Sequence, residues 1–92
     1  MEHVTPVHPG LVLKDELAEI GISQVALAKH LGVLPKTINE ICRGKRGISA
    51  EMAMKLARAL GASPQFWLNL QKNWELSQVN KDQFRNIRRI AA

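Results

Sequence analysis

A chain of 92 residues with 46% hydrophobic and 23% charged side chains has the size and composition of one folded domain, which excludes a disordered chain and a multidomain one. No apolar run approaches about 18 residues, and the first residues do not combine a basic segment with an apolar one, so we expect no membrane span, no secretion signal and a cytoplasmic location. The single cysteine, Cys42, excludes an internal disulfide and fits a reducing compartment.

The net charge of +5 is unevenly spread along the chain. Residues 1–32 carry two cations against four acids, residues 33–58 carry six against two, and residues 59–92 carry five against two. Such asymmetry indicates a basic face suited to phosphates. A solvated basic surface would explain the charge alone equally well.

Serine, proline and glycine signals divide the chain into five expected helices. The expected ranges are 9–20, 24–31, 35–43, 50–60 and 64–76, and each of the first four is followed by a glycine. We therefore predict an all-α fold in which five short helices form a domain over residues 1–79, followed by a basic tail over residues 80–92.

The expected third helix is amphipathic. Ile38 and Ile41 point to one side, and four polar side chains share an arc of roughly 100° on the other. These are Lys36, Asn39, Glu40 and Arg43. Arginine–guanine and asparagine–adenine pairs are usual routes for reading the major groove, so this face predicts contacts to base edges.

The cations beyond this helix have a different expected role. Lys45 and Arg46 lie in the following loop and are better placed to contact phosphates than bases. Glu40 can accept from cytosine or repel phosphate, so we assign it to specificity. A nucleotide-binding P-loop is excluded, because Asn39 and Arg46 stand where that motif needs a glycine and a Ser or Thr.

The second and third helices together resemble a helix-turn-helix, with Gly32 making the turn and Ala28 allowing a close crossing. Eight positions match its pattern: Gln24, Leu27, Ala28, Leu31, Gly32, Val33, Ile38 and Ile41. The stretches VHPGLVLKDELAEIGISQVALAKHLGV, INEICRGKRGIS and ALGASPQFWLNLQ resemble the HigA/VapI group of Xre/Cro-type repressors, over residues 7–79. Members of that group are antitoxins of toxin–antitoxin operons.

The resemblance implies a homodimeric, lambda-repressor-like protein that needs no cofactor, binds a palindromic operator in double-stranded DNA and represses its own operon. It also implies a partner, a small basic RNase toxin that cleaves mRNA on the ribosome and is held inactive. By resemblance Gln24 contacts phosphate, the base-reading helix carries Lys36, Thr37, Asn39 and Glu40, and its end and loop carry Arg43 and Lys45. Pro35 stands where many relatives have glutamine, so no operator sequence can be borrowed from them.

The expected fifth helix has apolar residues on two sides. Phe66, Trp67, Leu70 and Trp74 share an arc of roughly 100°, and Leu68 lies nearly opposite. Two interpretations stay open: the other helices bury this helix, or it forms a C2 dimer interface that places two recognition helices about 34 Å apart.

The remaining candidates indicate no enzyme. His3, His8 and His30 lack metal-ligand spacing, and His8 is expected to cap the first helix or face solvent. Cys42 is expected to be a small apolar residue beside the buried seam. In the tail, Phe84, Ile87 and Ile90 repeat every three residues and would suit a short amphipathic helix. Three fates stay open for it: packing on the dimer, binding the toxin, or fraying.

Three functional hypotheses follow. The first is a repressor that autoregulates its operon and acts as an antitoxin. The second is a toxin-neutralising interaction module with weak DNA binding, and the third is a phage-type repressor without a toxin.

Overall fold

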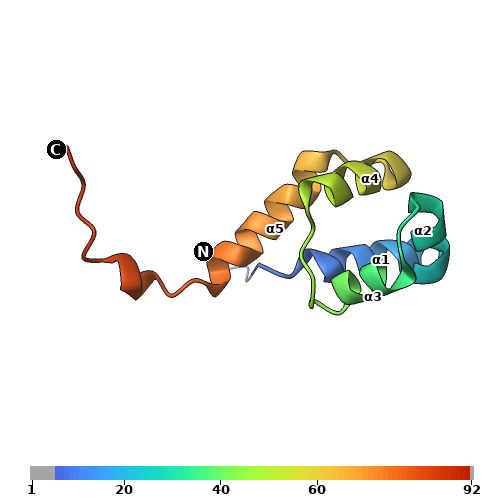
Figure 1. Ribbon diagram of the computed structural model, residues 1–92, viewed down its shortest axis with the longest axis horizontal. Coiled ribbons are helices and arrows are strands. Elements are labelled where there is room, and N and C mark those ends of the chain that lie inside the picture. Colours follow the sequence, from blue (N-terminus) through green and yellow to red (C-terminus); the bar gives the residue numbers. More distant parts are fainter. Residues whose placement is uncertain (1–5, 92) are drawn as a thin grey trace.

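The computed structural model describes residues 6–91, which form five α-helices and one short 3-10 helix (Figure 1). The helices are α1 (Pro9–Ile20), α2 (Gln24–Leu31), α3 (Pro35–Cys42), α4 (Ala50–Leu60), α5 (Pro64–Gln78) and η1 (Lys81–Phe84). No strand occurs among these residues, and the predicted all-α, five-helix fold is confirmed. Only two ends differ: α3 stops one residue early, and α5 runs two residues further because no helix breaker follows Leu76.

Side-chain caps fix the starts of four helices. The hydroxyls of Ser23, Ser49 and Ser63 each accept from the backbone N–H three residues later, at 3.0–3.1 Å. His8 Nδ1 accepts from the N–H of Gly10 at 2.9 Å, which confirms the capping role and not the solvent-facing alternative. Each cap satisfies one of the N–H groups that a helix start leaves without a partner.

The core lies between all five helices, and Trp67 of α5 is its largest buried side chain. The predicted seam contributes Leu27, Ile38 and Ile41, which are buried, whereas Leu31 and Val33 are half-buried at its edge. Cys42 is 5% exposed, and burial raises the pKa of its thiol. It is the apolar core residue that the sequence predicts. In Figure 1, α5 runs from its packing against α4 diagonally toward the start of α1.

The first turn of α1 packs directly on the last turn of α3. Gly10 is buried, and a Cβ atom there would lie 1.7 Å from the carbonyl oxygen of Ile41. The neighbouring His8 ring packs edge-on against Trp74 of α5, with ring centroids 4.7 Å apart. Residues 8–10 therefore hold the start of α1 against both the end of α3 and α5.

The C-terminal segment extends away from the helices (Figure 1). Every residue from 80 to 91 is exposed, and its only helical turn is η1, which Asn80 Oδ1 caps by accepting from the N–H of Asp82. The sequence leaves the conformation of this tail open; in the structure Phe84, Ile87 and Ile90 are exposed, and the segment forms no α-helix. No helix of the described residues is long and apolar enough to cross a membrane.

Candidate nucleic-acid interface

The turn between α2 and α3 has the geometry that the sequence predicts. Gly32 has φ +71°, in the left-handed region that favours glycine, and the N–H of Val33 donates to the carbonyl of Ala28 at 3.0 Å. Ala28 is fully buried, as a close helix crossing requires. The turn thus fixes the angle at which α3 leaves the body of the protein.

The polar face of α3 is directed to solvent. Pro35 opens the helix, and the side chains of Lys36, Asn39 and Arg43 are exposed, whereas Thr37 and Glu40 are half-buried. Ile38 and Ile41 on the opposite face are both 0% exposed. The helix is therefore anchored by its isoleucines and offers a polar surface wide enough to meet base edges.

A hydrogen bond links α2 to α3 on this surface. The Asn39 Nδ2 group donates to Gln24 Oε1 at 3.1 Å. This bond orients the amide of Asn39 and leaves Asn39 Oδ1 and the Gln24 amide nitrogen free to meet DNA. The sequence predicts both residues as DNA ligands but does not reveal that they pair.

Glu40 and Arg46 form an ion pair across the end of α3. Glu40 Oε1 accepts from Arg46 Nη2 at 2.8 Å and from Arg46 Nε at 3.1 Å. The hydrogen bond from Arg46 lowers the pKa of the Glu40 carboxyl. Arg46, expected to be a free phosphate ligand, is thus already partnered. Within residues 6–91, Lys36, Arg43 and Lys45 form no ion pair.

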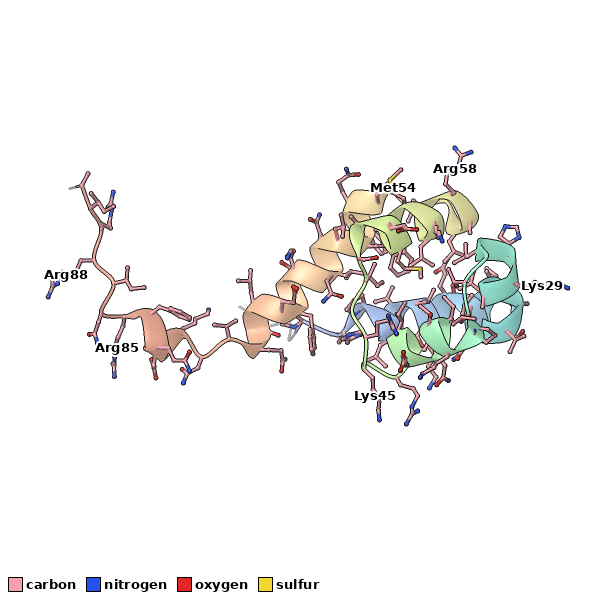
Figure 2. All side chains as sticks on the ribbon, viewed as in Figure 1. Lys29, Lys45, Met54, Arg58, Arg85 and Arg88 are labelled. Carbon is pink, nitrogen blue, oxygen red and sulfur yellow. The ribbon has the colours of Figure 1, made fainter. Side chains whose placement is uncertain are left out.

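The loop from α3 to α4 is held at both ends. At its start, the N–H of Lys45 donates to the carbonyl of Glu40 at 2.9 Å and that of Gly44 to Ile41 at 3.0 Å, with Gly44 at φ +74°. This is the Schellman arrangement of a helix C-terminus. Figure 2 shows Lys45 projecting from the side of the molecule where α3 lies, away from Met54 and Arg58 of α4.

Sequence reasoning missed the residue that holds the other end of this loop. Gln71 of α5 is only 8% exposed, and its Oε1 accepts from the N–H of Ile48 at 2.7 Å. A signal was present, because Gln71 lies four residues after Trp67 and three before Trp74, on the helix face where apolar residues would be expected.

The expected dimer face of α5 divides into two parts. Phe66 is 43% exposed, and Leu70 and Trp74 are half-buried. Trp67 is 1% exposed, so this residue belongs to the core and has no surface to offer a second protomer. The core interpretation is therefore confirmed for Trp67, and the dimer interface stays a prediction for Phe66, Leu70 and Trp74.

The described residues contain no group of three His, Cys, Asp or Glu side chains close enough to hold a metal ion. Among the three histidines named above, His8 is the cap of α1 and His30 is exposed on α2. His3 lies outside the described residues.

The chain is similar to known helix-turn-helix proteins. The helix-turn-helix family profile matches residues 13–67. Virulence-associated protein I of Dichelobacter nodosus is 46% identical over 77 residues, covering 83% of this chain and 71% of that one. Two solved structures are similar over the whole fold. Pseudomonas aeruginosa antitoxin HigA with the higBA promoter has a TM-score of 0.86 at 43% identity, covering 95% of this chain and 99% of that one. Antitoxin GraA in complex with its operator has a TM-score of 0.86 at 38% identity, covering 100% and 98%.

Proposed function

Because the chain belongs to the helix-turn-helix family, we propose that it is an antitoxin that binds operator DNA and represses its own operon. The observation that carries this proposal is the exposed polar face of α3 with Lys36, Asn39 and Arg43, set beside Gln24 and the basic loop. Similar proteins whose structures contain a promoter or an operator support it. A reporter gene behind the chain's own upstream DNA tests it: the chain should reduce expression, and Lys36→Ala should restore it.

The proposed DNA ligands fall into two groups, those that contact bases and those that contact phosphates. The side chains of α3 meet base edges and supply specificity, whereas Lys45 and the amide of Gln24 meet phosphates and set register. Arg46 can bind either Glu40 or a DNA phosphate. When a phosphate takes Arg46, the Glu40 carboxylate is free to accept a hydrogen bond from a base amino group. Glu40 thereby makes the affinity for DNA depend on the base sequence.

The proposed form on DNA is a C2 homodimer built through α5. Phe66 is the probe of this face, because it is its most exposed residue and Trp74 packs on the cap His8; the Phe66 ring also packs edge-on against Trp67, with centroids 5.2 Å apart, so circular dichroism must show that the variant is folded. Phe66→Ala should sediment as a monomer and bind a palindromic site more weakly, since the two α3 helices would no longer be held about 34 Å apart. Val25→Ala, at an exposed position on α2, is the control. Equal masses for Phe66→Ala and the parent would remove α5 as the dimer face.

The proposed protein partner is a small basic RNase toxin, which the antitoxin holds inactive. The experiment is to co-express the chain with the product of the neighbouring reading frame, purify the pair and measure cleavage of mRNA on ribosomes. A stable complex that suppresses cleavage supports the antitoxin role. A neighbour that neither binds the chain nor cleaves mRNA would favour a repressor without a toxin.

A further inference from the structure

The loop that carries Lys45 and Arg46 depends on one polar side chain from a distant helix. Ile48 closes this loop, with its side chain 4% exposed in the core and its N–H turned toward α5. That N–H donates to Gln71 Oε1 at 2.7 Å across 23 residues of sequence. Without this acceptor a buried backbone N–H would have no partner, a costly arrangement in a folded protein.

The loop backbone is also fitted closely around the Gln71 side chain. A Cβ atom at Gly47 would lie 2.8 Å from Nε2 of Gln71 and 3.0 Å from its Oε1. Gly47 does not have a positive φ, so its backbone conformation does not demand glycine. A side chain at position 47 would therefore displace the Gln71 amide.

The position of Gln71 on α5 is itself informative. The buried residues of α5 are Trp67 and Gln71, and an apolar residue at position 71 would serve the core better than an amide. The amide instead binds the backbone of the segment immediately after the two cations.

We propose that Gln71 is a positioning residue for DNA binding, which holds the loop of residues 43–49 so that Lys45 and Arg46 reach the DNA backbone. This inference rests on the proposed function. Because Gln71 and the proposed dimer face belong to one helix, the same bond ties the basic loop to the helix that carries that face. Gln71 does not itself touch DNA in this account.

The test is a mutant cycle read by salt dependence. Gln71→Ala removes the acceptor, Gly47→Ala displaces the side chain that carries it, and the double variant has room for both changes. Each should bind the chain's upstream DNA about tenfold more weakly than the parent, and the slope of log K against log salt should flatten by about one per protomer as phosphate contacts are lost. The double variant should match Gln71→Ala, because the two changes break the same bond.

The controls separate positioning from folding. Gln78→Ala changes an exposed glutamine of the same helix and should leave affinity and salt slope unchanged. Circular dichroism and sedimentation establish that each variant is folded and has the parent's mass at the assay temperature. Unchanged salt slopes in both single variants, or effects of Gly47→Ala and Gln71→Ala that multiply in the double variant, would overturn the proposal.

Failure of the proposed function gives a different binding result from failure of the positioning role. If the parent binds its upstream DNA and a scrambled duplex alike, the repressor role fails. The positioning role is still read on the scrambled duplex, because phosphate contacts determine the salt slope of any sequence. Equal slopes for the parent and Gln71→Ala on that duplex would overturn the inference as well.

Discussion

Replacing Gly10 by alanine should destabilise the protein strongly, although alanine is normally the better helix residue. At an open helix position this change would stabilise by about 0.5–1 kcal/mol. Here the added methyl would lie 1.7 Å from the carbonyl oxygen of Ile41, half the 3.4 Å at which ordinary contact begins, and 2.7 Å from the Ile41 carbonyl carbon. Both atoms are backbone, so no side chain can rotate away, and α1 and α3 must separate.

The expected cost of Gly10→Ala is about 3 kcal/mol, the upper part of the usual range for overpacking. For a domain of this size that corresponds to a melting temperature lower by roughly 12–24 °C. Thermal unfolding followed by circular dichroism at one fixed protomer concentration measures it, since dimerisation would make the midpoint concentration-dependent. Gly61→Ala is the matched control. Gly61 has φ +88° and no atom within 4 Å of an added Cβ, so only backbone strain of about 1–2 kcal/mol applies. A Gly10→Ala variant as stable as the parent would refute the close packing of α1 on α3.

Three further predictions concern charge. Lys45→Ala should weaken binding to all duplexes about equally and flatten the salt slope by about one unit per protomer; an effect confined to one base pair, seen by anisotropy on a set of substituted sites, would contradict a phosphate role. Glu40→Gln should release Arg46, so a scrambled duplex should bind more tightly, with a salt slope steeper by about one per protomer; an unchanged slope would mean that Glu40 does not hold Arg46 away from phosphate. Burial lowers the pKa of His8, and only its neutral Nδ1 can accept from the N–H of Gly10. Its contribution to stability is therefore complete above about pH 6.5, its unfolded value, and should be lost as the pH falls below that value toward the folded pKa. Urea unfolding between pH 5.5 and 7.5 measures this loss, and His8→Asn, which keeps a capping oxygen but does not titrate, should flatten the profile; an equal pH dependence in that variant would exclude His8 as the cause.

The features that the sequence predicts correctly are local ones. Ser23, Ser49 and Ser63 cap helices through atoms three residues away, and Gly32 sets the turn through its own backbone. The spacing of Ile38 and Ile41 directs the opposite face of α3 to solvent in any fold that buries them. These signals are contained within a few residues, so a sequence is sufficient to read them.

The contacts that the sequence did not predict are hydrogen bonds between segments that lie far apart along the chain. The bond from Ile48 to Gln71 and the pairing of Gln24 with Asn39 depend on how separate helices pack, which spacing along one helix does not describe. Trp67 shows the same limit. A core face and a dimer face both require apolar residues at helical spacing, so the pattern could not separate the buried Trp67 from the exposed Phe66.

In the tail, apolar residues with helical spacing have no buried surface to pack against. Phe84, Ile87 and Ile90 have the spacing of an amphipathic helix, but all three are exposed in the structure. Helical propensity over so few residues does not offset the entropy of ordering them without a surface to pack against. Local periodicity therefore predicts structure only where the fold supplies a core.

The proposed function requires that α3 and its neighbouring loop read a specific DNA site. Fluorescence anisotropy measures this with a labelled duplex from the chain's own upstream region, a scrambled duplex of the same composition, and two salt concentrations. We expect the upstream duplex to bind about 10³-fold more tightly or better, the usual margin of specific recognition. Equal binding of the two duplexes, with both released in moderate salt, would contradict the claim and reduce the basic stretch from Lys36 to Arg46 to a charged surface.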